Sequence, residues 1–220
     1  MRRIDRPSPN HDDRDGAVID MLVLHYTGMQ SAEAALARLT DPAAKVSAHY
    51  TVDEDGTVYA HVPETRRAWH AGASWWGGTA NLNANSIGIE LVNPGHEWGY
   101  RAFPQAQIEA LTTLCHSILA RHPIPSARVL GHSDIAPARK DDPGELFPWA
   151  QLAKAGIGLL PKKLPDGRDP EALALFGYDP SAPRDKVITA FQRHFRPRRC
   201  DGAWDEECAG LLAGLLARLL

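Results

Sequence analysis

The stretch Val18-Ile19-Asp20-Met21-Leu22-Val23-Leu24-His25 sets the architecture of this chain. Its short apolar run predicts a buried strand, and the polar His25 stands at the end of that strand. Two further strands are expected beside it. Ser86-Ile87-Gly88-Ile89-Glu90-Leu91-Val92 predicts a second buried strand that carries one charged residue, Glu90. Residues 128–132 predict a short strand that runs into a loop.

Helical segments and a hairpin are expected around these strands. Residues 31–39 are rich in alanine and begin with a serine suited to capping a helix. After Pro104, apolar residues recur every three or four positions, which predicts a longer helix. Residues 48–52 and 57–62 predict a hairpin whose turn uses the conformational freedom of Gly56.

We expect the chain to fall into four parts. An extended polar arm covers residues 1–15, and a main α/β domain covers residues 16–158. A linker with proline and lysine covers residues 159–166, and a small helical domain covers residues 167–220. A helical domain of this size is marginally stable alone, so we expect it to lean on the main domain.

Composition excludes some functions. The 220 residues include 24 Lys and Arg and 27 Asp and Glu, so the net charge is −3. This near balance argues against a general nucleic-acid binder, which needs a strong basic field. No apolar run reaches the roughly 18 residues of a membrane span. The first residues lack the apolar segment of a signal peptide, so we expect a cytoplasmic location; a truncated start or paired cysteines would instead indicate the periplasm.

Three cysteines are too few for a disulfide scaffold. Cys115 falls in the apolar stripe of the helix that follows Pro104 and is expected in the core. Cys200 and Cys208 lie eight residues apart near the end of the chain. We expect two half-buried thiols there, with a disulfide as the alternative.

Two histidines and one carboxylate are spaced so that they could form a metal site. His25 ends a buried strand, and His132 follows a second strand. Asp142 comes ten residues after His132, and Pro137 and Pro143 restrict the loop between them, so the two side chains could converge. Two histidines, one carboxylate and an open fourth position make the ligand set of a catalytic zinc site. The alternative for each histidine is a hydrogen-bonded structural role.

Further residues could serve such a site. Glu90 lies on an otherwise apolar strand, where an unpaired carboxylate is costly, so it is expected to act as a general base or to form a salt bridge. Lys140 could stabilise an oxyanion, or it could be a solvated surface lysine. Tyr50 could present its hydroxyl to the site. His49 would then face the other side of its strand and be structural.

Five segments in this order resemble the zinc-dependent N-acetylmuramoyl-L-alanine amidases of the AmpD-like type. They are Leu24-His25-Tyr26-Thr27, Ser47-Ala48-His49-Tyr50, Ala68-Trp69-His70-Ala71-Gly72, Asn85-Ser86-Ile87-Gly88-Ile89-Glu90 and Gly131-His132-Ser133-Asp134-Ile135-Ala136-Pro137-Ala138-Arg139-Lys140-Asp141-Asp142-Pro143-Gly144. The resemblance covers about residues 17–155. It implies a mixed β-sheet flanked by helices.

The resemblance also implies a site and a reaction. One Zn²⁺ per chain would be held by His25, His132 and Asp142, with catalytic roles for Glu90 and Lys140. The reaction would be hydrolysis of the amide bond between the lactyl group of N-acetylmuramic acid and L-alanine, in peptidoglycan or in soluble muropeptides. A non-catalytic peptidoglycan-recognition protein of similar fold is the alternative, as is a binding module without metal. The presence of Asp142 favours the hydrolase, because a binder can lose that ligand.

Aromatic residues accompany these motifs. The resemblance places His70, in the loop Trp69-His70-Ala71-Gly72, at a substrate-contact position, and a structural loop role for His70 is the alternative. Trp69, with Trp75 and Trp76, could form a flat wall for a sugar, or these tryptophans could belong to the core of their loop.

The last part of the chain resembles a three-helix peptidoglycan-binding domain. The matching segments are Leu175-Phe176-Gly177-Tyr178, Ile188-Thr189-Ala190-Phe191-Gln192-Arg193-His194-Phe195 and Asp201-Gly202. The chain departs from that pattern in having cysteines where small apolar residues are expected. A basic cluster, Arg193, Arg196, Arg198 and Arg199, is expected to be a solvated helix end, with contact to anionic wall polymers as the alternative.

Overall fold

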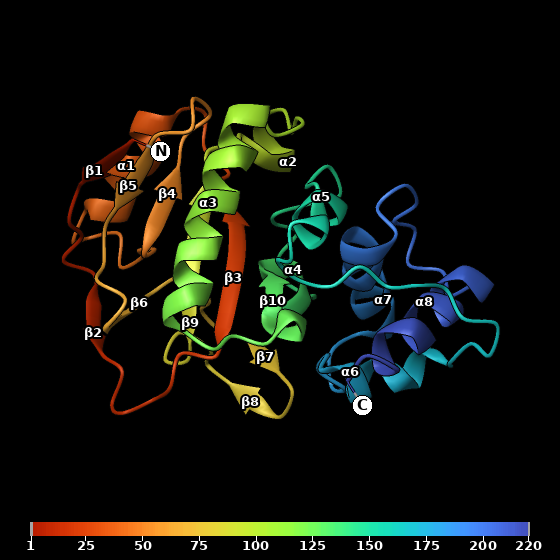
Figure 1. Ribbon diagram of the computed structural model, residues 1–220. Helices are drawn as coiled ribbons and strands as arrows, with labels where there is room; N and C mark the ends of the chain where they lie inside the picture. Colours follow the sequence, from red (N-terminus) through yellow and green to blue (C-terminus); the bar gives the residue numbers. More distant parts are fainter. Residues whose placement is uncertain (1, 220) are drawn as a thin grey trace.

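The computed structural model describes residues 2–219 and contains a six-stranded mixed sheet with helices around it (Figure 1). The strand order is β1-β5-β4-β9-β3-β10. In this order the strands span Arg3–Asp5, Val58–Ala60, Tyr50–Val52, Ser86–Leu91, Met21–Tyr26 and Val129–Gly131. Strands β4 and β5 form the expected hairpin, and β4, β9, β3 and β10 run parallel to one another. The predicted α/β class with a mixed sheet is confirmed.

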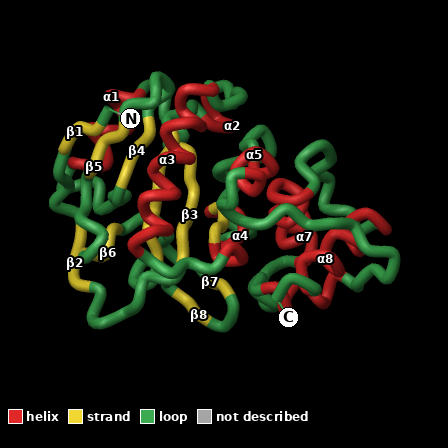
Figure 2. The backbone as a smooth tube through the Cα atoms, viewed as in Figure 1, coloured by secondary structure: helices red, strands yellow, loops and turns green. Residues whose placement is uncertain are grey.

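The remaining elements surround this sheet, and Figure 2 shows the helices on its outside. The helices are α1 (Ala32–Thr40), α2 (Gly95–Trp98), α3 (Gln105–Arg121), α4 (His132–Ile135), α5 (Trp149–Lys154), α6 (Leu173–Phe176), α7 (Arg184–Phe195) and α8 (Glu206–Leu216). Single 3₁₀ turns span Ser126–Arg128 and Pro170–Ala172. Two small antiparallel sheets pair β2 (His11–Asp13) with β6 (Arg66–Ala68) and β7 (Trp75–Trp76) with β8 (Thr79–Ala80).

Strand β3 lies inside the sheet and is apolar on both faces. Because side chains alternate along a strand, Leu22 and Leu24 point to one face and Met21 and Val23 to the other. The first pair joins a core with α3, the helix that crosses the sheet in Figure 1. The second pair joins a separate core that includes α6, α7 and α8. A continuous apolar run is therefore what this strand requires.

The C-terminal unit, which comprises the helices in the part of the chain after residue 166, packs against the rest of the chain, as expected for so small a unit. Their apolar residues form one core with Met21 and Val23. The segment expected as a linker, residues 159–166, packs along α8. A Cβ on Gly214 would collide with the carbonyl of Lys162, and one on Gly210 would lie 2.7 Å from the carbonyl of Leu164. The two glycines of this apolar helix therefore let the chain pass close to it.

The predicted arm, residues 1–15, is extended and joins two sheets. β1 adds a parallel edge strand to β5, and β2 pairs with β6. The buried side chain of Arg14 donates to the carbonyls of Glu64, Ala84 and Ser86. The arm is thus attached to the body by backbone pairing and by one buried guanidinium.

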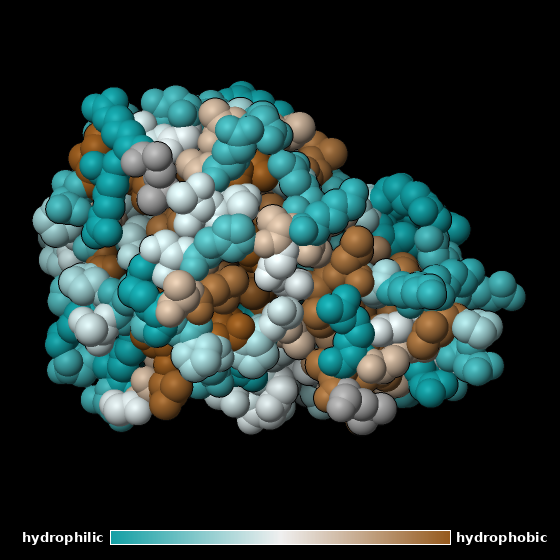
Figure 3. All heavy atoms as spheres, viewed as in Figure 1, coloured by the Kyte–Doolittle hydropathy of each residue, from teal (hydrophilic) through white to brown (hydrophobic). Residues whose placement is uncertain are grey.

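Within residues 2–219, no helix has the length and apolar character to cross a membrane. On the face shown in Figure 3, hydrophobic residues appear in separate patches among hydrophilic ones. The large exposed apolar residues also lie apart along the sequence: Val18, Trp98, Leu146, Leu160, Leu175 and Leu219.

The three cysteines are all reduced. Cys115 is buried in α3, and Cys200 and Cys208 both carry free thiols.

The arginines of the basic cluster differ in exposure. Arg196 is buried and pairs with Asp205, whereas the neighbouring arginines of the cluster are more exposed and also face acidic residues. Only part of the basic cluster is therefore a solvated helix end.

Candidate metal centre and active site

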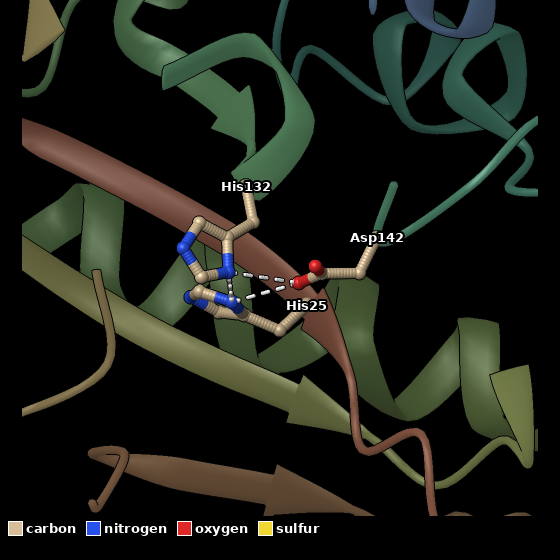
Figure 4. Close-up of side chains that lie close together, drawn as sticks. All are labelled: His25, His132 and Asp142. Atoms are coloured by element: carbon tan, nitrogen blue, oxygen red, sulfur yellow. Dashed lines mark hydrogen bonds and ion pairs between the residues drawn. The ribbon is translucent and has the colours of Figure 1, made fainter. Parts of the chain in front are cut away.

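The three predicted ligands converge at the end of β3 (Figure 4). His25 belongs to β3, His132 begins α4, and Asp142 lies in the loop after α4. Nδ1 of His25 lies 2.9 Å from Nδ1 of His132 and 3.0 Å from Oδ2 of Asp142, and the last two atoms are 3.1 Å apart. All three side chains are buried. This group could hold a metal ion.

Hydrogen bonds behind His25 determine which of its nitrogens carries the proton. These hydrogen bonds form a chain whose last acceptor is the carbonyl oxygen of Leu82. Because a carbonyl oxygen can only accept, the hydroxyl of Ser86 donates to it at 2.6 Å. Oγ of Ser86 then accepts from Nε2 of His70 at 3.1 Å. Nδ1 of His70 in turn accepts from Nε2 of His25 at 3.0 Å. In a neutral His25, Nδ1 is therefore an unprotonated acceptor that faces the other two ligands.

His132 is oriented in the same way by backbone. Its Nε2 lies 3.0 Å from the carbonyl oxygen of Ala71 and 3.3 Å from Nη2 of Arg139. In the neutral tautomer that donates to Ala71, Nδ1 of His132 is again an acceptor. Two imidazole lone pairs and the carboxylate of Asp142 thus point at one another, an arrangement that a cation between them would make favourable. Histidine nitrogens backed by hydrogen bonds to their outer nitrogens are typical of metal ligands. The residues present fit a divalent metal.

The electrostatics agree with this donor set. Burial lowers the pKa of His25 to about 4, and the neighbouring His132 acts in the same direction, so the ring of His25 is neutral at pH 7. Burial also holds the pKa of His70 well below its ordinary value. For Asp142, burial opposes ionisation, but the two adjacent histidines outweigh it and keep the pKa well below the usual range. Neutral imidazoles and an ionised carboxylate are the states that bind metals.

Glu90 stands beside the three ligands. It is the sheet partner of His25, so both side chains lie on the same face. Burial, reinforced by the charge of Asp142 and opposed by Lys140, raises the pKa of Glu90 well above its ordinary value. Within the described part of the chain, its buried Oε2 has no hydrogen-bond partner. An unpaired carboxylate of raised pKa is well suited to exchange protons near neutral pH.

A cavity of about 290 Å³ opens over these residues. Five predicted site residues line it with Trp69 and His70; they are His25, Glu90, His132, Lys140 and Asp142. The rest of the wall comes from residues 26–29 at the end of β3 and just after it, from the inner side of α1, and from residues 46–47. The structure therefore brings together all of the predicted site residues except Tyr50.

The expectation that Tyr50 faces this site is corrected by the structure. In the sheet Tyr50 is opposite Ile89, whereas its neighbour Thr51 is opposite Glu90. Because side chains alternate, Tyr50 points to the face away from Glu90 and packs in the core that contains α3. Its hydroxyl donates to Oε1 of Glu64 at 2.7 Å.

His49 is on the site face but is structural, as expected. Its Nδ1 accepts from the amide of Gly88 at 3.0 Å, and its Nε2 lies 2.9 Å from Nη2 of Arg14. Burial and the charge of Arg14 lower its pKa to about 3. His49 therefore connects the N-terminal arm to β9 beneath the cavity.

His70 lines the cavity, but both of its ring nitrogens are engaged, one by His25 and the other by Ser86. Its loop is fixed by Asn83, whose Oδ1 accepts from the amides of His70 and Ala71. Strand β9 makes room for the ring at Gly88, where a Cβ would collide with it. These contacts favour positioning of His25 over contact with a substrate.

The other aromatic residues divide between cavity and core. Of the three tryptophans considered as a wall for a sugar, Trp69 lines the cavity. Trp76 is buried and packs edge-on against Phe176 and Tyr178 of the C-terminal unit, with ring centroids 5.6 and 4.9 Å away. Trp75 lies outside the cavity. The two adjacent tryptophans therefore do not form a wall of this site.

Sequence reasoning missed the supporting residues Ser86 and Asn83. Ser86 is the first residue of β9 and Asn83 lies in the turn before it, so both resemble ordinary turn residues. The available signal was the burial expected for Ser86, because a buried hydroxyl needs a partner.

Replacing His70 by leucine is expected to weaken metal binding by about 10- to 100-fold, the usual effect of losing a partner behind a metal ligand. The affinity would be measured by competition with a chelator of known strength. His61 offers a matched control, because it is also buried and bonded, to Thr51 and to the carbonyl of Arg6, but touches no ligand. Equal affinities for His70→Leu and His61→Leu would contradict a positioning role for His70.

The family model described as N-acetylmuramoyl-L-alanine amidase matches residues 15–145. The chain is 41% identical over 232 residues to the N-acetylmuramoyl-L-alanine amidase AmiD of Escherichia coli K12, covering 91% of this chain and 83% of AmiD. It is 34% identical over 164 residues to the 1,6-anhydro-N-acetylmuramyl-L-alanine amidase AmpD of the same strain, covering 66% of this chain and 87% of AmpD.

Solved structures agree with these matches. AmiD from E. coli in complex with the substrate anhydro-N-acetylmuramic acid-L-Ala-D-γ-Glu-L-Lys superposes with a TM-score of 0.83 at 40% identity, covering 92% of this chain and 91% of AmiD. AmpDh3 from Pseudomonas aeruginosa gives 0.84 at 35% identity, covering 96% and 94%. The fold, the convergent ligands and these matches lead to one conclusion: the chain belongs to the N-acetylmuramoyl-L-alanine amidase family.

Proposed function

We propose that this chain is a zinc enzyme that hydrolyses the amide bond between the lactyl group of N-acetylmuramic acid and the L-alanine of the stem peptide. The observation that carries the proposal is the convergence of three acceptor atoms beside the unpaired carboxylate of Glu90, at the base of a cavity. Two neutral imidazoles and one carboxylate make a ligand set that suits Zn²⁺ and leaves a position open.

The metal and its ligands define the reacting centre. Bound at His25, His132 and Asp142, Zn²⁺ supplies Lewis acidity, which polarises a carbonyl group and lowers the pKa of water. His70 holds His25 in the tautomer that this binding needs, and the carbonyl of Ala71 can accept from His132 in the matching tautomer. The centre is thereby prepared before substrate arrives, which reduces reorganisation during the reaction.

Glu90 handles the proton. Among residues 2–219 its Oε2 has no partner to displace, so it can accept a proton from the attacking water and then donate it to the nitrogen of the departing L-alanine. The raised pKa matters for the second transfer, because a carboxyl group of ordinary acidity is a weak proton donor at neutral pH. One residue thus serves as base and then as acid.

Lys140 supplies positive charge at the same cavity. An ammonium beside the scissile carbonyl stabilises the negative charge that develops on its oxygen. Trp69, on the cavity wall, offers an apolar surface to the substrate. The family resemblance supports the role of Lys140.

The substrate class follows from the relatives. The structures of AmiD and AmpDh3 include complexes with anhydromuramic peptides, which supports a muropeptide as the ligand of this cavity. We further propose that residues 167–220 form a peptidoglycan-binding-like domain after the linker at 159–166, with the main domain at 16–158. The presence of both Asp142 and Glu90 at the cavity favours hydrolysis over recognition alone.

The proposal is tested with the purified chain and a soluble anhydro-muropeptide. We expect release of the free stem peptide, about one zinc per chain in elemental analysis, and loss of activity after treatment with a chelator, because the Lewis acid is removed. Zinc added back in excess of the chelator should restore the rate. Protein that binds the muropeptide without releasing peptide, with zinc present, would favour a recognition protein instead.

A further inference from the structure

The segment that carries two of the three ligands is in contact with the C-terminal helices. This ligand segment runs from Gly131 through α4 to Asp142. Asp134, in α4, accepts hydrogen bonds from the amide of Gly131 at 2.8 Å, from the hydroxyl of Tyr178 at 2.7 Å and from Nδ1 of His194 at 2.8 Å. Tyr178 and His194 both belong to the C-terminal unit. One carboxylate thus joins that unit to the turn on which His132 is mounted.

Asp134 is almost completely buried, with 1% of its surface exposed, as is Tyr178. A buried carboxylate is tolerated only when hydrogen bonds replace its lost hydration. Two of its three donors come from the C-terminal unit, so their removal would leave the charge under-satisfied. Asp134 lies two residues after His132, and a shift of this short helix moves the ligand directly.

The ring of His194 is itself held firmly. It stacks on Trp149 at 3.8 Å and on Phe195 at 3.9 Å between ring centroids. Trp149 begins α5, which follows the ligand segment in the chain. The ring of His194 is thus stacked between two aromatic rings, which fixes the direction of its hydrogen bond to Asp134.

The other end of the ligand segment has its own contact with α7. Nη2 of Arg193 lies 2.8 Å from Oδ1 of Asp141, the residue before Asp142. Its Nε also lies 3.8 Å from Oε2 of Glu145. Adjacent residues of one helix, Arg193 and His194, therefore hold both ends of the segment that supplies two ligands.

The packing around these bonds allows little independent movement. Gly77 of the β7–β8 hairpin donates its amide to the carbonyl of Gly177 at 2.8 Å, and Trp76 packs against Tyr178. Apolar residues of α7 and α8 share one core with β3 and β10. A loosely tethered binding module would show neither feature.

We propose that the C-terminal unit is a working part of the metal centre: Tyr178, His194 and Arg193 are positioning residues that hold His132 and Asp142 in place for metal binding. The expected loss of hydrolytic activity rests on the proposed function, whereas the expected loss of zinc affinity does not. The proposal goes beyond a wall-binding role, because it requires the unit even when the substrate is a small soluble muropeptide.

The test uses the full chain with Tyr178→Phe and His194→Phe combined, which removes the two donors that the C-terminal unit supplies to Asp134 and keeps aromatic rings. Zinc affinity is measured by chelator competition, and kcat and KM are measured on the soluble muropeptide. We expect zinc affinity to fall by about 10-fold, the lower end of the effect of supporting residues, with a fall in kcat and little change in KM. Lys186→Ala and Leu175→Ala, exposed residues of the same unit, should leave all three values unchanged.

Two further measurements separate positioning from folding. The melting temperature of each metal-free variant shows whether the fold persists. If the double variant is unfolded, Tyr178→Phe alone and Arg193→Gln, which removes the ion pair to Asp141, replace it. Zinc affinity and soluble-substrate activity equal to those of the unmodified chain, in folded variants, would overturn the inference. An unmodified chain that binds zinc but hydrolyses nothing would refute the proposed function, and the zinc measurement would still decide this inference.

Discussion

Replacing Glu90 by glutamine is expected to lower kcat/KM on a soluble muropeptide by about 10²- to 10⁴-fold, the range lost when a general acid–base is removed. The amide has nearly the shape of the carboxylate but cannot accept and return a proton. Zinc content should be unchanged, because Glu90 is not among the three converging ligands. The measurement is a progress curve of peptide release, with zinc determined on the same protein.

Glu64→Gln provides the matched control. Glu64 is also a partly buried glutamate, but Arg121, Tyr50 and His122 bind its carboxylate and outweigh the effect of burial, so its pKa falls to about 2. Its replacement should reduce stability and leave turnover intact.

The raised pKa of Glu90 also predicts the pH dependence of the activity. Because only the ionised carboxylate can accept a proton, activity should fall as the pH drops through a value above the pKa of an ordinary carboxyl group. Equal turnover by Glu90→Gln and the unmodified chain would eliminate Glu90 as the proton carrier.

The strands and the residues at their ends were predictable from sequence. The apolar runs around Leu22 and Ile89 are long enough to require burial on both faces, and they carry His25 and Glu90. The structure adds the register, in which His25 and Glu90 are opposite each other in neighbouring strands. The serine before residue 32 caps α1 as expected, with its Oγ accepting from the amide of Ala34. Such local signals act within a few residues, so a single sequence contains them.

Tyr50 shows where local signals end. Alternation correctly separates Tyr50 from His49, but it does not say which of the two faces carries the site. That choice depends on α3, which begins more than fifty residues later and covers the Tyr50 side. An argument from β4 alone could not include that helix.

The hydrogen bonds that support the ligands could not be predicted from the sequence either. Asp134 is 44 residues from Tyr178 and 60 from His194, and no periodicity connects them. The role of His70 depends on a loop that turns its ring inward to His25. Ligand types were readable from sequence because the chemistry of a metal restricts them, whereas their supports can be any residue able to donate or accept.

Replacing Asp142 by alanine is expected to lower zinc affinity by more than the roughly 10- to 100-fold that the loss of a supporting residue causes, because a ligand itself is removed. His25 and His132 would remain, with no carboxylate to balance the charge of the metal. Chelator competition measures the affinity, and Asp12→Ala, which removes a carboxylate that pairs with Arg67 and is not among the three converging ligands, is the control.

Thermal unfolding distinguishes a ligand from a merely structural carboxylate. A ligand that binds only the folded chain stabilises it by about 2.7 kcal/mol when present at 100 times its dissociation constant, so zinc should raise the melting temperature of the unmodified protein. For Asp142→Ala at the same zinc concentration, that rise should disappear. A structural carboxylate would behave differently: its loss would lower the melting temperature with and without zinc and leave the rise intact. A full zinc-induced rise in Asp142→Ala would therefore remove Asp142 from the ligand set, and with it the feature that favours hydrolysis over recognition.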